Sequence, residues 1–373
     1  MQKHSSVAIL CWLAESGLSP DLLRILLDEC PVPELILEKF LCTGSLPIEC
    51  PLPSGIQTHL RSSCSDSELS RWEQAAERHG IQAVTVAEES FPDHLRNLPE
   101  APAILFFLGQ LKALEYASVS MVGSRNASYK GLEATEKTAE KLSRSGISVV
   151  SGLAYGIDAA AHRGCLKGGT PTIAVMGCGL DQDYPAENAG LKKEILRNGG
   201  LILSEYAPGE KPLGWHFPYR NRIISGLGDC LILMEARIRS GSMTTVQHAL
   251  NQGKDVFVYP GEPGNAKSEG NHQLLREGAI YFTSAEDIME DMGWLDKRMD
   301  VRQNNESVTE PLVPLSPDEK TVLEQLDKGE RSFDQLCDAL MMPASQLNAT
   351  LSLLQIHGMI RVLPGRVFQK KLE

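Results

Sequence analysis

The sequence predicts an α/β protein: a Rossmann-like, doubly wound and mostly parallel sheet, with a small N-terminal helical domain and a C-terminal winged-helix domain. Three observations predict this arrangement. From Ser118 onward, short runs rich in valine and isoleucine alternate with helical stretches, which is typical of a parallel sheet covered on both faces. The first 80 residues carry mainly helical patterns. The last 57 residues carry three helical patterns and a short hairpin.

These changes of pattern predict the domain boundaries. We expect a helical domain at residues 1–85, a Rossmann-like domain at 86–292, a linker at 293–316 and a winged-helix domain at 317–373. A chain of this length has room for about two or three domains, so the division is a normal one.

The N-terminal domain is divided by helix start and stop signals. We expect helices over Val7–Glu15, Pro20–Glu29, Val32–Phe40 and Ser67–His79. Residues 41–66 are rich in serine, proline, cysteine and glycine, and they predict a loop. The apolar stretch after residue 6 is too short for a convincing signal peptide, and no run is long enough to span a membrane. We therefore expect a cytoplasmic protein with no membrane partner.

The central domain reads as strands and helices in alternation. A short strand is expected over Ile81–Val86, and a segment opened by Phe91-Pro92 ends in the apolar run Ala103–Leu108. Further strands are expected over Ser118–Val122, Ile147–Ser151, Thr172–Met176, Leu201–Ser204, Cys230–Met234, Asp255–Tyr259 and Ala279–Phe282. Helices are expected near Gly131–Ser145, Asp158–Lys167, Glu187–Asn198, Arg220–Gly226, Met243–Gln252 and Asn271–Glu277. In such folds the ligand binds beyond the carboxyl ends of the strands.

Glycine-rich loops follow several of these strands at their carboxyl ends. They contain Gly123-Ser124-Arg125 with Ser128, Gly152 to Asp158, Gly177-Cys178-Gly179, and Ser240-Gly241-Ser242. Glycine lets the backbone approach a ligand, and a helix N-terminus favours phosphate. For any one loop a tight turn alone is an adequate explanation, but several loops on one rim favour a phosphate-bearing ligand.

The usual nucleotide cofactors do not fit these loops. No GxxxxGK[ST] motif is present, so a P-loop is excluded. The first loop reads GSRxxSxxG rather than GxGxxG, and no acidic residue follows the second strand where a dinucleotide fold would bind ribose. We expect no cofactor. The nine cysteines form no CxxC pair and no histidine cluster has zinc spacing, so we expect no metal either.

A segment around Phe217 combines aromatic and basic residues. It runs from Trp215 to Gly226 and includes Arg220 and Arg222. Single-stranded DNA stacks its bases on aromatic rings while arginine holds the backbone. Composition alone leaves open the alternative that Trp215 and Phe217 are core residues beside a solvated helix face.

The net charge of −12 at first argues against nucleic acid. Residues 118–290, however, hold 18 lysines and arginines against 19 aspartates and glutamates, so most of the acidity lies in the flanks. A nearly neutral central domain can still present a basic face.

Over residues 90–290 the sequence closely resembles the DprA/Smf family of DNA-processing proteins. The resemblance rests on Gly123-Ser124-Arg125-x-x-Ser128, Ser151-Gly152-Leu153-Ala154-x-Gly156-Ile157-Asp158, His162, Phe217-Pro218-x-Arg220-Asn221-Arg222, Glu235-Ala236, Ser240-Gly241-Ser242, Tyr259-Pro260-Gly261 and Asn271. It implies a protein that binds single-stranded DNA, loads a RecA-type recombinase during natural transformation or recombination, and forms a homodimer through the Rossmann-like domain.

The resemblance also implies which residues bind DNA. These are Gly123, Ser124, Arg125, Ser128, Gly152, Phe217, Arg220, Asn221, Arg222, Ser240, Gly241 and Ser242. Family members often carry a basic residue shortly before the Phe-Pro pair. Here Gly214, Trp215 and His216 stand there and Lys211 lies further back, so stacking on Trp215 is an alternative to that contact.

The flanking domains resemble the family less closely. The N-terminal helices are similar to its small SAM-like domain, but the glycine-rich turn of helix-hairpin-helix proteins is missing, so no DNA binding is assigned there. The C-terminal segment resembles a winged helix, with helices over Pro317–Leu326, Ser332–Leu340 and Pro343–His357. Residues 344–350 carry no lysine or arginine, which favours a partner-binding or degenerate winged helix over one that reads DNA.

The alternative function is an enzyme on the same fold. Lonely-guy phosphoribohydrolases share a glycine-rich turn after a late strand and place a catalytic glutamate on the helix that follows. The corresponding position here holds Gln247, which lacks a carboxylate. Asp158 and His162 lie four residues apart and are interpreted as structural. We therefore expect a protein with no catalytic residues.

Overall fold

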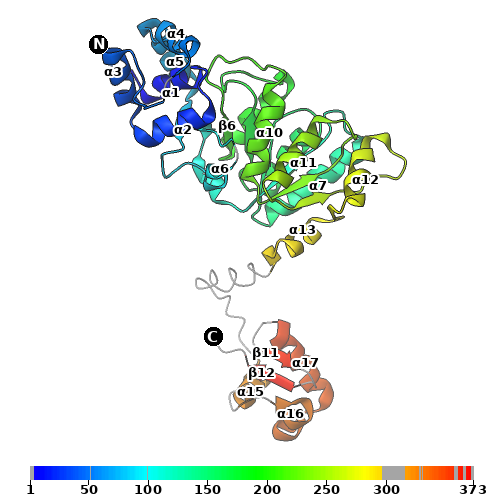
Figure 1. The fold of residues 1–373 in the computed structure, drawn as a ribbon. Coiled ribbons are helices and arrows are strands. Elements are labelled where there is room, and N and C mark those ends of the chain that lie inside the picture. The colour runs from blue at the N-terminus through cyan, green and yellow to red at the C-terminus, as the bar shows by residue number, and fades with distance from the viewer. Residues whose placement is uncertain are drawn as a thin grey trace. The chain divides into compact units, whose positions relative to one another are not determined.

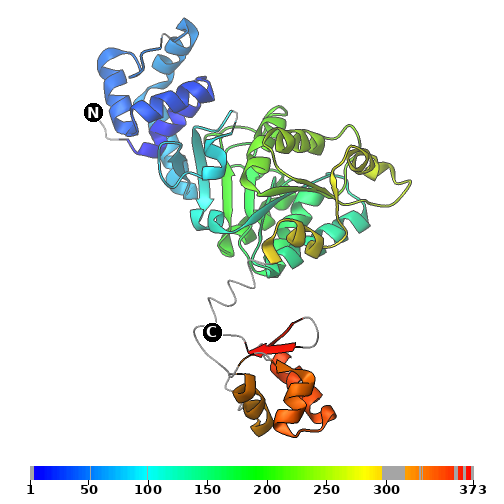
Figure 2. The same cartoon turned by 60° about the horizontal axis from the view of Figure 1, so that its bottom comes forward.

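The computed structural model describes residues 4–50, 52–98, 100–295, 316–326, 329, 331–356, 360–363 and 367–370. The chain divides into two compact units, residues 1–296 and 297–373 (Figures 1 and 2). Most of the linker expected at 293–316 lies outside the described residues, as does the turn of the C-terminal hairpin at 364–366.

The N-terminal helices pack around a buried tryptophan. The helices are α1 (Ser6–Ala14), α2 (Pro20–Glu29), α3 (Pro33–Thr43), α4 (Ser54–Ser63) and α5 (Asp66–His79). The expectation of a loop over residues 41–66 was wrong, because it contains α4. This helix is largely polar, but it buries Leu60 completely, and the indole N–H of Trp12 donates to the Leu60 carbonyl oxygen at 3.2 Å. Tertiary packing rather than sequence periodicity stabilises α4.

The larger unit is built on one nine-stranded sheet. Its strands are β1 (Gln82–Thr85), β2 (Ile104–Gly109), β3 (Ser118–Val122), β4 (Ser148–Ser151), β5 (Ile173–Met176), β6 (Leu201–Ser204), β7 (Cys230–Leu233), β8 (Val256–Val258) and β9 (Ile280–Tyr281). The spatial order is β1-β2-β6-β5-β4-β3-β7-β8-β9. Strands β3 to β9 pair in parallel, while β1 and β2 form an antiparallel edge. The predicted Rossmann-like, mostly parallel sheet is confirmed.

Helices cover both faces of this sheet (Figures 1 and 2). They are α6 (Asp93–Arg96), α7 (Tyr129–Arg144), α8 (Ile157–Gly168), α9 (Ala189–Arg197), α10 (His216–Leu227), α11 (Gly241–Asn251), α12 (Glu269–Arg276) and α13 (Ala285–Asp291). Short 3₁₀ helices span Leu111–Glu115, Ala186–Asn188 and Ala266–Ser268. Alternate side chains of β7 pack into two different hydrophobic cores, one on each face of the sheet. Ile232 packs with α7, α8 and α13, and Leu233 belongs to the core that contains α10 and α11.

The winding direction reverses at β3. From β3 the chain goes to β4, β5 and β6 on one side of the sheet, then crosses back to β7 on the other side and continues to β8 and β9. Where the chain leaves two adjacent parallel strands in opposite directions, a crevice opens at the carboxyl ends of those strands. Here that crevice lies beyond β3 and β7.

The N-terminal helices and the sheet share one continuous hydrophobic core. The edge strand β1 pairs with β2, with Thr85 opposite Ile104. The domain boundary expected after residue 85 therefore falls between two paired strands of the same sheet. Across the described residues, no helix is both long and apolar enough to cross a membrane.

The smaller unit has the winged-helix order that the sequence predicts. It contains α15 (Pro317–Leu326), β10 (Arg331–Ser332), α16 (Phe333–Leu340), α17 (Ala344–Ile356), β11 (Ile360–Leu363) and β12 (Val367–Lys370), with strand order β10-β12-β11. Leu336, Leu347, Leu351 and Phe368 are among the residues of its own small core.

Candidate nucleic-acid interface

A cleft of about 650 Å³ opens at the point where the sheet reverses its winding. Its walls come from the loops after β3 and β7 and from the first turns of α10 and α11. The lining residues are Val122, Gly123, Ser124, Arg125, Asn126, Ala154, Asp158, Tyr184, Pro212, Gly214, Phe217, Pro218, Arg220, Asn221, Ile224, Arg237, Ser240, Gly241, Ser242 and Thr245. This volume is large enough for a nucleotide-sized group, since ligand pockets commonly measure about 300–1,000 Å³.

The loop after β3 is fixed against the loop after β7. The Ser124 N–H donates to the Glu235 carbonyl oxygen at 2.7 Å, which joins the ends of the two strands. A side chain at Gly123 would meet Ile157 Cγ1 at 2.6 Å and the Glu235 carbonyl oxygen at 2.9 Å. Glycine is therefore required at this turn by close packing, and the turn is held rigidly beside the cleft.

Ser128 has a structural role that the sequence did not reveal. Its hydroxyl donates to Glu235 Oε2 at 2.5 Å and accepts from the Gly131 N–H at 3.0 Å, so it caps α7. The backbone N–H of Ser128 also donates to Glu235 Oε1 at 2.8 Å. Ser128 is not among the lining residues of the cleft. Ser128 thus holds the loop that carries Arg125, and its expected DNA contact stays a prediction. Glu235 is a buried hydrogen-bond acceptor rather than a free acid.

Arg125, Phe217 and Tyr184 form a layered group inside the cleft. The guanidinium carbon of Arg125 lies 5.3 Å from the centre of the Phe217 ring. Tyr184 stacks against the same phenyl ring, with a centroid distance of 5.3 Å and an interplanar angle of 30°. The alternative that Phe217 is a core residue is wrong, because its ring lies at the wall of the cleft between a cation and a half-exposed tyrosine.

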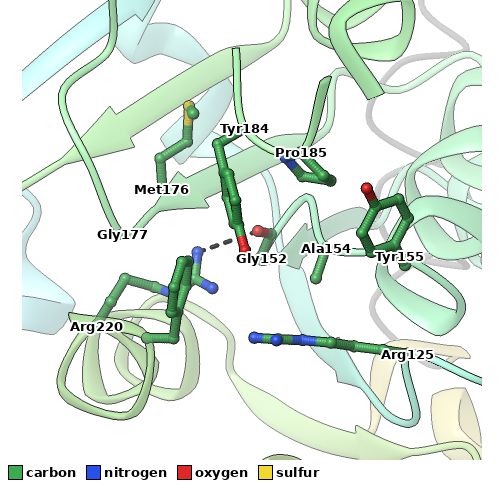
Figure 3. A pocket seen from close by; sticks show the side chains of 10 residues that line it. Arg125, Gly152, Ala154, Tyr155, Met176, Gly177, Tyr184, Pro185 and Arg220 are labelled. Carbon is green, nitrogen blue, oxygen red and sulfur yellow. Dashed lines mark hydrogen bonds between the residues drawn. The ribbon is translucent and has the colours of Figure 1, made fainter. Parts of the chain in front are cut away.

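Arg220 forms the buried floor of the same cleft. Figure 3 shows a small pocket that adjoins the cleft and shares Arg125 and Arg220 with it; the two arginine side chains enter this pocket from opposite sides. Arg220 is 3% exposed, and its Nη1 donates to the carbonyl oxygens of Gly152, at 3.1 Å, and of Val175. Its Nε has no hydrogen-bond partner among the described residues. Burial lowers the pKa of Arg220 to about 10, against the opposing effect of Asp158, so the guanidinium stays charged at neutral pH.

Asp158 holds this floor in place. Its Oδ2 accepts from the Gly152 N–H at 3.2 Å and the Ala154 N–H at 3.4 Å. Burial raises the pKa of Asp158, and the neighbouring Arg220 opposes that shift. The structural role expected for Asp158 fits these contacts. His162 does not contact it, and instead its Nδ1 lies 2.8 Å from Thr172 Oγ1 in the core.

The structure separates Arg222 from the rest of its motif. Arg222 is 2% exposed, is not among the cleft-lining residues, and its Nη2 pairs with Glu205 Oε1 at 2.7 Å. Its Nε also donates to the Glu100 carbonyl oxygen at 2.8 Å. Residues two apart on a helix point to different sides, which is why Arg220 reaches the cleft and Arg222 does not. In this structure Arg222 forms an ion pair with Glu205, and the expected DNA contact at Arg222 stays a prediction.

The start of α11 forms another wall of the cleft. Ser240 caps this helix through a 3.2 Å hydrogen bond from the Ser242 N–H, and Gly241 is exposed beside it. The side-chain amide of Asn221 donates to Thr244 Oγ1 at 3.1 Å, which fixes α10 against α11. Gly152 lines the adjoining small pocket with Arg125, Tyr184 and other residues.

Sequence reasoning missed several side chains at this site, among them two tyrosines and an arginine. Tyr184 and Tyr155 line the small pocket, and Arg237 lines the main cleft. Each of these residues follows the carboxyl end of a strand in the sequence. That position was the one signal from which the sequence could have predicted them. Tyr184 was missed because it comes eight residues after β5.

The position that corresponds to the Lonely-guy catalytic glutamate lies away from the cleft. Gln247 lies exposed on α11, outside the cleft lining, and donates to Asn251 Oδ1 at 3.0 Å. Among the residues that the structure describes, no group of histidines, cysteines and carboxylates has the arrangement of a metal site.

Comparison with known proteins identifies the family. The profile described as DNA recombination-mediator protein A matches residues 82–293, and that of the DprA winged helix domain matches residues 306–366. DNA processing protein DprA of Streptococcus pneumoniae is 44% identical over 205 residues, which cover 55% of this chain and 72% of that protein. Protein Smf of Escherichia coli is 34% identical over 305 residues, covering 79% and 78%.

Solved structures give the same result. The structure of DprA from Streptococcus pneumoniae matches with a TM-score of 0.65 and 37% identity, covering 78% of this chain and 98% of that one. DNA processing protein A from Helicobacter pylori, solved to study its single-stranded DNA binding mode, matches with a TM-score of 0.52 and 30% identity, covering 57% and 95%. The resemblance inferred from the motifs is confirmed, and the chain belongs to the DNA recombination-mediator protein A family, the DprA/Smf group of DNA-processing proteins.

Proposed function

We propose that this protein binds single-stranded DNA in the cleft beyond β3 and β7 and acts as a mediator of recombination. In this role it protects the strand and loads a RecA-type recombinase on it, in natural transformation or another recombination process. It works as a homodimer through the Rossmann-like domain, and it acts by binding rather than by catalysis. The recombinase and the dimer are proposed from the family resemblance.

One observation supports the DNA-binding proposal most strongly. A cationic side chain, Arg125, lies over the aromatic face of Phe217 in a cleft whose floor is the buried Arg220. A nucleotide of a single strand offers the two matching groups, a phosphate for the guanidinium and an unpaired base for the ring. Buried charge is costly unless it has a function or a partner, and Arg220 retains an Nε without one among the described residues.

The proposed contacts explain a preference for single strands. Arg125 and the backbone N–H groups of the Gly123–Ser124 turn bind one phosphate, and Phe217 stacks the neighbouring base. Bases inside a duplex have no free faces, so duplex DNA loses the stacking contribution of about 1–3 kcal/mol per base. The net charge of −12 further weakens nonspecific attraction to duplex DNA.

Fluorescence anisotropy with labelled oligo-dT and with a duplex of equal length tests this proposal. We expect salt-sensitive binding to oligo-dT and much weaker binding to the duplex. Arg125→Ala should weaken oligo-dT binding and reduce the salt slope by about one. The matched control is Arg163→Ala, which removes an exposed arginine of α8 that does not line the cleft.

Two results would contradict the proposal. The first is equal affinity for single and double strands. The second is an Arg125→Ala protein whose binding curve coincides with that of Arg163→Ala. Recombinase loading is tested separately, by measuring filament formation on oligo-dT with and without the wild-type protein, and the dimer is tested by sedimentation equilibrium.

A further inference from the structure

Trp215 is an exposed aromatic residue immediately outside the cleft. It is 63% exposed, while Trp12 and Trp72 are buried and Trp294 is half-buried. It stands at the start of α10, two residues before Phe217. A single exposed apolar side chain is normal on a protein surface, so it is the position of Trp215 beside the cleft, rather than its exposure alone, that points to a ligand.

The ring of Trp215 is held in place by its neighbours. It meets the imidazole of His216 edge to face at a centroid distance of 4.1 Å, and it meets the Tyr206 ring in the same way at 6.4 Å. His216 is itself buried, and its Nδ1 lies 3.2 Å from the Gly177 carbonyl oxygen. The indole is thus supported at a fixed position while one surface stays open to solvent.

The segment leading to Trp215 continues the wall of the cleft. Pro212 and Gly214 line the cleft, and the exposed Lys211 precedes them. A strand that leaves the cleft along this wall would find a cation and then an aromatic ring, which is the combination that single-strand binding sites use.

Trp215 and Phe217 cannot clamp the same base. Because residues two apart at the start of a helix point to different sides, their rings serve two separate positions along a strand. Phe217 faces the cleft and Trp215 lies beyond the residues that line it.

We propose that Trp215 stacks one unpaired base outside the cleft, next to the nucleotide held by Arg125 and Phe217, and that Lys211 attracts the phosphate between them. This inference rests on the proposed function, since it requires that the cleft bind single-stranded DNA. It adds a second stacking position, and with it a path for the strand across residues 211–215.

Intrinsic tryptophan fluorescence tests this inference directly. Titration of the wild-type protein with unlabelled oligo-dT should quench the emission, because the most exposed of the four tryptophans would be covered by a base. Trp215→Leu keeps an apolar side chain but removes the ring, and it should abolish the quenching and lower oligo-dT affinity by about tenfold. Trp215→Phe should retain most of the affinity. Circular dichroism verifies that both variants are folded.

The possible results separate this inference from the proposed function. Tight oligo-dT binding by anisotropy without any quenching, or with full affinity in Trp215→Leu, would overturn the second stacking position and leave the cleft proposal standing. Absence of oligo-dT binding in the wild type would overturn both. A Trp215→Leu protein that binds oligo-dT normally but fails only in recombinase loading would assign Trp215 to a protein contact and would also overturn the inference.

Discussion

Arg222 Nη2 lies 2.7 Å from Glu205 Oε1, in an ion pair whose side chains are 3% and 16% exposed. The pair joins α10 to the segment that follows β6. Arg220, two residues earlier on the same helix, points instead to the cleft floor. Two arginines of one motif therefore have different tasks, and mutations can distinguish them.

We expect Arg222→Met to destabilise the fold without removing the cleft. Loss of one partner of a buried pair leaves an uncompensated charge, at a cost of about 3–5 kcal/mol in the free energy of unfolding. Urea denaturation measures this loss. The double variant Glu205→Gln with Arg222→Met should recover part of it, because no charge is left unpaired. An Arg222→Met protein of normal stability that no longer binds oligo-dT would instead place Arg222 at the DNA.

Gly152→Ala should disturb the cleft floor. A methyl group there would lie 2.7 Å from Asp158 Oδ2 and 2.8 Å from Arg220 Nη2. We expect overpacking to cost about 1–3 kcal/mol of stability, and oligo-dT affinity to fall because Arg220 must move. The control is Gly190→Ala on α9, where nothing lies within 4 Å of the added methyl group. Equal affinity of the two alanine variants would argue against a role for Arg220 in binding.

Arg237→Ala should weaken binding to any single-stranded sequence. Arg237 is exposed and lines the cleft in the loop between β7 and α11. We expect the salt slope of oligo-dT binding to fall by about one, as for loss of one phosphate contact, with little change in stability. Arg197→Ala, at the exposed end of α9, is the comparison. An unchanged slope in Arg237→Ala would show that Arg237 does not reach the strand.

Acid should destabilise the protein through His162. Burial, assisted by Arg220 and Arg163, lowers the pKa of His162 from 6.5 to about 3. Between these values the unfolded chain binds a proton there and the folded protein does not, so stability falls as the pH falls. We expect the stability difference between wild type and His162→Gln to change by up to about 1.4 kcal/mol per pH unit between pH 6.5 and 3. Parallel stability curves for the two proteins would contradict this assignment.

The sheet was predictable because buried parallel strands are short apolar runs, which stand out between glycines. The runs Ser118–Val122 and Leu201–Ser204 were placed without error, and the others differ by one residue at one or both ends. The helix α4 escaped prediction because only Leu60 on it is fully buried, and its stability depends on Trp12 from a distant helix.

The candidate site was predictable where backbone geometry determines it. Gly123 and Gly152 lie in close contacts that exclude a side chain. The direction of a side chain around a helix was harder to predict, because the start of α10 was expected four residues too late, at Arg220 instead of His216. The residues of the motif at 217–222 are adjacent in sequence, but in the structure Arg220 lines the cleft and Arg222 is buried away from it.

The reversal of winding at β3 has a consequence for the order of events on the ribosome. The first cleft residues, up to Arg125, are made early. The other wall needs α10, which begins 91 residues later at His216, and the first turn of α11, which begins 116 residues later at Gly241. A nascent chain that ends before Ser242 lacks that wall. Under the proposed function, a chain can therefore bind single-stranded DNA only after both halves of the sheet have been synthesised and joined.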